Sequence, residues 1–343
     1  MTLPTAKVLY DNLKTFGLTP SQVRKLLPAW WSKEAEREPD GVAELCVLVS
    51  RRLSLDLGAL LEGKLQRKDK ALTLAYKHSA SVTADTLQGA TSVGLSLAEA
   101  VTAAMVGTSY VPPGTTAEFR KRVKARGRGI VGLGAILDTC WESGIPVVPM
   151  TTLPVGMRKM DGAVINCNGR PVIIVSKKKS SRAWLSFIIA HEIGHIACGH
   201  LTESSSIVDV SLQEQVTYEA ESSSDKQERE ADAFALELMG GKAVNDEIAS
   251  WASYLSPVEI AVRAREAQNE VQTESGHLVL RYAFETKRWP ESMTAMNFLS
   301  EDSDGEGAMR RAFEQNLDLD NVADDLQDLI EQVTGISRAD ESA

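Results

Sequence analysis

Apolar residues recur with helical spacing along most of the chain. Residues 184–201 form an apolar run long enough for a buried helix, and residues 225–239 repeat their apolar positions at i, i+3, i+4 and i+7. The second stripe consists of Ala231, Phe234, Ala235 and Leu238. It predicts a helix that packs one face against a core and leaves the other face in water.

Two short apolar runs, 164–167 and 172–175, flank the pair Asn168-Gly169. Asn-Gly between apolar runs is the strongest short signal for a β-hairpin, so we predict two paired strands. The second strand leads through three lysines to the 184–201 helix, which Ser180 or Ser181 would cap. The hairpin could keep one edge open for an extended peptide, or it could be a closed part of the core.

Further helical patterns divide the chain into four predicted units. Residues 1–66 have the short helices and polar turns of a helix-turn-helix bundle. Residues 67–112 form a helical connector that ends at a Pro-Pro-Gly break. Residues 113–245 hold the hairpin and the two strongest helices, and residues 246–343 are helical and acidic.

Residues 202–227 separate the two strongest helices and are rich in Ser and Glu. This composition predicts a mobile loop. Such a loop could act as a lid over a cleft or be a disordered insertion.

The composition indicates a cytoplasmic protein. The chain has 343 residues, a net charge of −10 and four cysteines without paired spacing, which is typical of reduced thiols. The acidic balance argues against a chain-wide nucleic-acid surface. We find no signal peptide and no apolar stretch of about 18 residues, so no membrane span is expected.

The apolar run 184–201 contains the motif His191-Glu192-Ile193-Gly194-His195. Two histidines four residues apart share one face of a helix and can bind one Zn²⁺, while Glu192 faces the open position of the metal as a catalytic base. The alternative is a pair of buried histidines that match the motif by chance.

A catalytic zinc site needs a third protein ligand. Glu228 and Asp232 border the apolar stripe of the second helix. Glu228 would complete a His₂Glu site, and Asp232 would accept the outer N–H of a ligating histidine. Alternatively, Asp225 and Glu228 are the N-cap of a helix and its N3 partner.

Two further histidines have weaker cases. His200 could line the cleft or stabilise a transition-state oxyanion, or it could be an exposed residue at the helix end. His277 is a more remote candidate for the metal centre.

The hairpin, the sequence Ala-His-Glu-Ile-Gly-His and the later Glu-x-Glu-Ala-Asp-Ala-Phe-Ala-Leu-Glu-Leu-Met together resemble the ImmA/IrrE metallopeptidases over residues 125–245. The resemblance implies a small zincin-like domain with zinc on His191, His195 and Glu228. Asp232 stands where the family often has Asn, and a Gly pair follows the second helix where Pro is common. The predicted fold class is thus mainly α with a small α+β zincin-like metallopeptidase domain, an N-terminal helix-turn-helix-like domain and a helical C-terminal region.

The resemblance also implies a function. We expect a zinc endopeptidase that cleaves one dedicated protein, a repressor or an antitoxin, in a stress, phage or defence response. Two other classes stay open: a DNA-binding transcription regulator whose metal domain is a sensor or scaffold, and a toxin or defence component that a partner restrains.

The N-terminal unit ends in a segment similar to phage-repressor-like (XRE-type) domains. Where a recognition helix is expected, however, residues 28–40 carry Trp30, Trp31 and an acidic cluster. Acidic side chains disfavour contact with phosphates, so DNA binding is possible but not favoured, and docking of a protein is the preferred interpretation.

Overall fold

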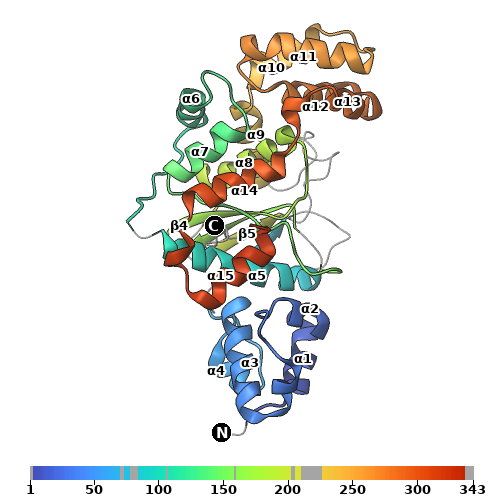
Figure 1. Cartoon of the computed structure of the whole chain (residues 1–343). Helices are drawn as coiled ribbons and strands as arrows, with labels where there is room; N and C mark the ends of the chain where they lie inside the picture. Colours follow the sequence, from blue (N-terminus) through green and yellow to red (C-terminus); the bar gives the residue numbers. More distant parts are fainter. Residues whose placement is uncertain are drawn as a thin grey trace, which may run out of the picture.

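The computed structural model describes residues 3–69, 73–77, 84–105, 107–157, 160–201, 205–209 and 226–336. Three parts follow one another along its long axis (Figure 1): an N-terminal helical unit, a central sheet covered by helices, and a helical module at the far end. The prediction of a mainly helical chain with a small β part is confirmed.

The N-terminal unit is built from short, capped helices. They are α1 (Ala6–Thr15), α2 (Pro20–Lys25), the 3₁₀ turn η1 (Lys33–Arg37), α3 (Pro39–Arg52) and α4 (Leu57–Leu61). Thr5, Thr19 and Asp56 each accept a hydrogen bond from a first-turn N–H, which satisfies donors that a short helix otherwise leaves unpaired. Leu9, Leu13, Leu45 and Val49 fill the space between the helices.

The central sheet has five strands in the order β1-β5-β3-β4-β2. They are β1 (Thr73–Lys77), β2 (Val147–Pro149), β3 (Gly162–Cys167), β4 (Arg170–Val175) and β5 (Ser205–Asp209). β3 and β4 form the predicted hairpin, with Cys167 opposite Arg170. Both turn residues, Asn168 and Gly169, have positive φ, as a two-residue hairpin turn requires.

The hairpin lies in the middle of the sheet. β5 pairs with the outer side of β3, and β2 pairs with the outer side of β4. Of the two alternatives, the structure favours the closed hairpin, because residues 162–165 of β3 pair with β5 and residues 173–175 of β4 pair with β2. β5 also falls inside the segment predicted as a loop, of which residues 202–204 and 210–225 lie outside the described residues.

The two faces of the sheet carry different helices. α5 (Ala84–Ala104) crosses one face so closely that a Cβ on Gly94 would lie 3.5 to 3.8 Å from side-chain atoms of Met160, Ile165 and Ile174. α8 (Arg182–Ala197) covers the other face, α7 (Leu133–Glu142) contacts β2 beside it, and α9 (Lys226–Leu238) packs on α8 (Figure 1). Because both faces are covered, the hairpin strands are almost continuously buried.

The predicted C-terminal region, 246–343, is divided between two cores. Around α11 and α12, side chains such as Ile260, Leu278 and Tyr282 form a separate core. The helices of this module are α10 (Gly241–Ser250), α11 (Pro257–Val271), α12 (Ser275–Thr286) and α13 (Trp289–Met296).

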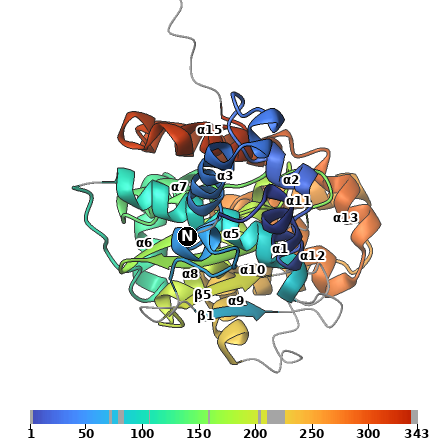
Figure 2. The same ribbon diagram turned by 90° about the horizontal axis from the view of Figure 1, so that it is seen from below.

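The last two helices return to the centre of the molecule. α14 (Gly305–Asn316) packs beside α7, where the rings of Phe313 and Trp141 lie 6.0 Å apart. α15 (Asp324–Thr334) lies against α3 and α5 (Figure 2). The remaining described elements are α6 (Thr116–Arg126) and the 3₁₀ turns η2 (Ser300–Asp302) and η3 (Leu319–Asn321). None of the helices in the described part of the chain combines the length and apolar composition needed to cross a bilayer.

Two adjacent arginines join the N-terminal unit to α15. Arg52 is fully buried and donates hydrogen bonds to the Leu26 carbonyl at 2.6 Å and to Asp328. Arg51 is half exposed and pairs with Asp325 at 2.8 Å. A buried guanidinium has no water to replace lost partners, whereas an exposed one does.

These arginines give a paired test. We expect Arg52→Met to lower the free energy of unfolding by about 3 kcal/mol, because it leaves buried acceptors without their donor. Arg51→Met, the matched control, should cost less than about 1 kcal/mol because water screens that pair. Urea unfolding of both variants measures the difference, and equal losses would contradict the assignment of Arg52 as the structural link.

Candidate metal centre

The helix that carries the histidine motif is held at both ends. Of the two predicted capping serines, Ser181 accepts a hydrogen bond from the Trp184 N–H, and Asp302 accepts one from the Ala183 N–H at 2.8 Å. The helix ends at Cys198, followed by Gly199 in the left-handed conformation. The site helix is therefore fixed from its first turn to its last.

Three buried side chains converge between α8 and α9. Glu228 Oε2 lies 3.4 Å from His191 Nε2, and Glu228 Oε1 lies 3.5 Å from His195 Nε2. The two Nε2 atoms are 3.0 Å apart. These residues could hold a metal ion: all three ligand atoms lie within 4.8 Å of one another. Two imidazoles and one carboxylate form a donor set typical of catalytic zinc. Asp225, the alternative N-cap, lies outside the described residues.

Asp232 determines which nitrogen of His191 faces this cluster. Its Oδ1 lies 2.8 Å from His191 Nδ1, and both side chains are buried. If Asp232 accepts the hydrogen of His191 Nδ1, the neutral imidazole turns an unprotonated Nε2 toward the cluster. A bare Nε2 that faces a carboxylate and a second imidazole is suited to a cation.

Behind His195 lies His200. Its Nδ1 is 2.9 Å from His195 Nδ1, and its Nε2 is 2.9 Å from Glu230 Oε2. The His200 side chain is only 4% exposed. Both of its ring nitrogens thus have partners on the side away from the cluster. His200 is therefore not an exposed residue at the helix end, and it is not placed to contact a reacting carbonyl. Hydrogen bonding to His200 and Lys226 holds the pKa of Glu230 below its usual range.

Glu192 is fully buried and packs against the first residue of β3. A Cβ on Gly162 would lie 2.0 Å from Glu192 Oε1, in the space that the carboxylate fills. Next to Gly162, Asp161 accepts two hydrogen bonds from Lys177 Nζ, at 2.9 and 2.8 Å. The first residue of β3 therefore packs directly against the Glu192 carboxylate.

The packing of the two helices sets the position of Glu228. A Cβ on Gly194 would lie 2.8 Å from both the Cα and the carbonyl oxygen of Ala231, and 3.1 Å from Phe234 Cβ. Because a glycine of α8 faces a small residue of α9, the backbones come close enough for the glutamate to reach both imidazoles.

His277, the remote candidate, is not among the three grouped residues. It lies buried in α12, where burial and the nearby charges of Arg281 and Arg120 lower its pKa to about 3. It is a neutral residue of the C-terminal module.

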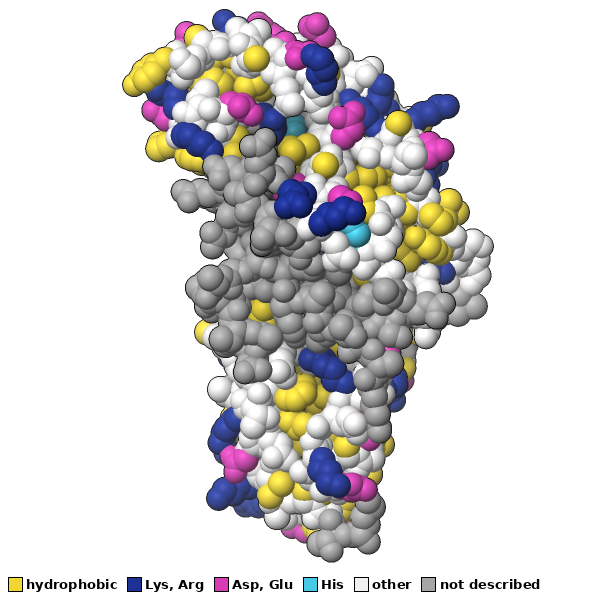
Figure 3. Space-filling view, turned by 180° about the vertical axis from the view of Figure 1, so that it is seen from behind, with side chains coloured by type: hydrophobic (Ala, Val, Ile, Leu, Met, Phe, Trp, Pro, Cys, Tyr) yellow, Lys and Arg dark blue, Asp and Glu magenta, His cyan; other side chains and the backbone are white. Residues whose placement is uncertain are grey.

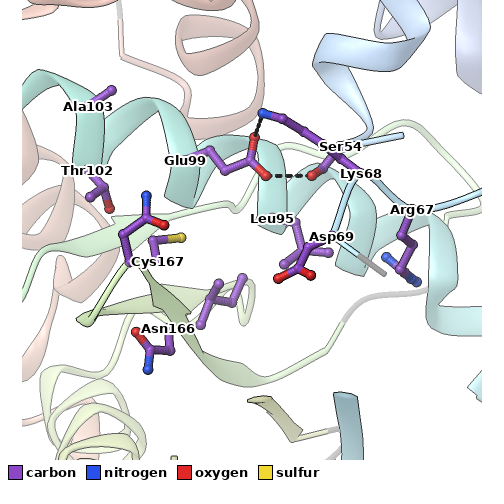
Figure 4. A pocket seen from close by; sticks show the side chains of 12 residues that line it. Ser54, Arg67, Lys68, Asp69, Leu95, Glu99, Thr102, Ala103, Asn166 and Cys167 are labelled. Atoms are coloured by element: carbon purple, nitrogen blue, oxygen red, sulfur yellow. Dashed lines mark hydrogen bonds and ion pairs between the residues drawn. The ribbon is translucent and has the colours of Figure 1, made fainter. Parts of the chain in front are cut away.

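A separate cavity of about 780 Å³ lies on the α5 face of the sheet. It opens between the N-terminal unit, α5 and the tip of the hairpin (Figure 4). Glu99 accepts hydrogen bonds there from Ser54 at 2.7 Å and Lys68 at 3.0 Å. Burial raises the pKa of the Cys167 thiol in its wall to about 12. The sheet separates this cavity from the histidine cluster.

The sequence did not indicate that Gly162 contacts Glu192 or that Glu230 contacts His200. No local pattern indicates that the hairpin start meets Glu192. The one available signal for His200 was Gly199, because a glycine after a helix often folds the chain back on itself.

With this geometry in view, comparison with known proteins indicates a peptidase. The sequence profile of the Peptidase U49 family matches residues 182–275, which run from the start of α8 into α12 and include all three grouped residues and Glu192. The matching profile is thus that of Peptidase U49 and not that of the ImmA/IrrE peptidases, which the sequence resembles. No curated protein and no solved structure matches the chain.

The helix spacing can be tested at Gly194. We expect Gly194→Ala to weaken zinc binding at least about tenfold and to lower stability by about 1–3 kcal/mol, because the added methyl group pushes α9 away. Gly134→Ala is the matched control. Its Cβ would meet only Arg182 Nη2, at 3.6 Å, so this helical replacement should leave zinc affinity unchanged. Chelator competition and urea unfolding measure both, and unchanged zinc affinity in Gly194→Ala would contradict the spacing argument.

Proposed function

We propose that the chain is a zinc-dependent endopeptidase. The observation that carries the proposal is the convergence of His191, His195 and Glu228 beside the buried Glu192, within a segment similar to a peptidase family. Zinc is preferred over Mg²⁺ or Ca²⁺ because two of the three donors are imidazole nitrogens, and those hard cations favour oxygen.

His191, His195 and Glu228 would hold the ion, and Asp232 would keep His191 in the required tautomer. A bound zinc ion supplies Lewis acidity, which polarises the scissile carbonyl and lowers the pKa of water. Glu192 takes a proton from the attacking water and passes it to the leaving amine as the C–N bond breaks. Its burial against Gly162 restricts the carboxylate to one position, which favours rapid proton transfer.

We propose one dedicated protein substrate, a repressor or an antitoxin. Support for a dedicated partner comes from the resemblance to ImmA/IrrE peptidases. Strand addition of an extended peptide to the hairpin is restricted, since residues 162–165 of β3 already pair with β5 and residues 173–175 of β4 already pair with β2. A substrate would then depend on other docking contacts.

The regulator alternative is not favoured by the N-terminal unit. The exposed face of α3 carries Asp40, Glu44 and Val47, and Arg51 is paired with Asp325. Lys and Arg side chains of this unit alternate with Asp and Glu on the face shown in Figure 3. A DNA-binding surface needs a cluster of positive charge to meet the phosphates.

Glu192→Gln tests the mechanism. We expect this variant to bind zinc as the wild type does and to cleave about 10²–10⁴ times more slowly, since the amide cannot accept the proton. Gly162→Ala should give the same result because its methyl group displaces the carboxylate, with Gly134→Ala again as control. Mass spectrometry of new protein N-termini in cells that express each variant measures cleavage. Full peptidase activity of pure Glu192→Gln would refute the mechanism, whereas cellular function that is unaffected by Glu192→Gln would favour a sensor or scaffold.

A second prediction concerns selectivity. The purified zinc form should leave casein nearly uncut, yet cleave a cognate regulator at one or two sites in a reaction that requires Glu192. Gel analysis over time, with Glu192→Gln as the inactive control, distinguishes the two cases. Rapid digestion of casein would instead indicate a general protease.

A further inference from the structure

The second histidine of the cluster has an unusual neighbour. His195 Nδ1 faces His200 Nδ1 at 2.9 Å, and His200 Nε2 faces Glu230 Oε2 at 2.9 Å. The two Nδ1 atoms face away from the metal cluster, so here one ring must donate and the other accept, whereas the two Nε2 atoms, 3.0 Å apart, would both be bare toward a bound ion. The direction of this bond decides which nitrogen of each ring is bare.

The metal ligand determines the direction. If His195 binds the ion through Nε2, that atom is bare and the proton of the neutral ring is on Nδ1. His195 Nδ1–H then donates to a bare His200 Nδ1, and His200 carries its own proton on Nε2. That proton faces the carboxylate of Glu230, which accepts it. Every donor in the chain from His195 to Glu230 thus meets an acceptor.

The end of α8 places His200 in this position. Cys198 is the C-cap, Gly199 has φ of 70°, and the His200 N–H donates to the His195 carbonyl at 3.0 Å. The Gly199 N–H donates to the Ile196 carbonyl at 3.2 Å. These are the two bonds of a Schellman turn, which reverses the chain after a helix. The reversal lays the imidazole of residue 200 against the ring of residue 195.

We propose that His200 and Glu230 are positioning residues that hold His195 in its metal-binding tautomer, as Asp232 does for His191. The inference rests on the proposed zinc site. It assigns His200 no contact with substrate, since both ring nitrogens are engaged. The two ligand histidines are oriented differently. The buried carboxylate of Asp232 contacts His191 directly, whereas the imidazole of His200 lies between His195 and the half-exposed carboxylate of Glu230.

The role makes a specific demand on position 200. The side chain must offer an acceptor to His195 and a donor to Glu230. Glutamine can do both through its amide, whereas leucine fills a similar volume and does neither. If His200 only filled space, leucine would be the better replacement. Comparison of His200→Gln with His200→Leu therefore separates positioning from packing.

The measurement is zinc affinity, obtained by competition with a chromophoric chelator on the full chain. We expect His200→Leu to bind zinc about 10–100 times more weakly than wild type, and His200→Gln to stay within about threefold. The visible spectrum of the Co²⁺ form should change in His200→Leu and resemble wild type in His200→Gln, because it reports the arrangement of the ligands.

A second pair of variants covers the case in which His200→Leu does not fold. Glu230 is 40% exposed, so Glu230→Ala should not disturb the core. We expect it to weaken zinc binding by up to about tenfold, because His200 loses the acceptor that orients it. Glu237→Ala, an exposed position on the same helix, is the matched control and should bind as wild type does.

The outcomes separate this inference from the proposed function. If wild type binds zinc and both His200→Leu and Glu230→Ala bind it equally well, the positioning role is overturned while the zinc site stands. Equal loss in His200→Gln and His200→Leu would also overturn it, in favour of packing. If wild type itself binds no zinc, the proposed function fails and the positioning role fails with it.

Discussion

The close approach of α8 to α9 is the constraint on which the rest of the site depends. At Gly194 the two backbones meet with no room for a side chain, and this contact brings Glu228 within reach of both imidazoles. The same approach brings Asp232 to His191 and Glu230 to His200. The contact at Gly194 thus sets the distance between the two helices that carry the donor set.

Local patterns predict the elements of this fold better than their arrangement. Two short apolar runs and the Asn168-Gly169 turn are enough for the hairpin, and helical periodicity is enough for α8 and α9. The position of the hairpin within the sheet depends on β5, a short strand whose apolar residues, Ile207 and Val208, stand in a segment otherwise rich in Ser and Glu. Strand pairing between distant segments is a tertiary property, so the sequence leaves the open and the closed hairpin as alternatives and the structure decides for the closed one.

The residues of the site also differ in whether a local pattern predicts them. Spacing on one helix places His191 and His195 together, and the face of a second helix indicates Glu228 and Asp232. By contrast, the wall that Gly162 gives to Glu192 comes from a strand, and the burial of His200 comes from a backbone reversal. Both depend on contacts across elements, which periodicity does not encode.

The cap on α8 has a consequence for the order in which the protein is made. Asp302 accepts a hydrogen bond from Ala183, which precedes it by 119 residues. Arg52 of the N-terminal unit likewise pairs with Asp328 of α15, which is made much later. A nascent chain emerges at about 5–20 residues per second. For several seconds of translation, α8 therefore has only Ser181 as an acceptor for its first turn, and the N-terminal unit lacks its link to α15. The supports of α8 and of the N-terminal unit thus come from segments that are made much later than the elements they stabilise.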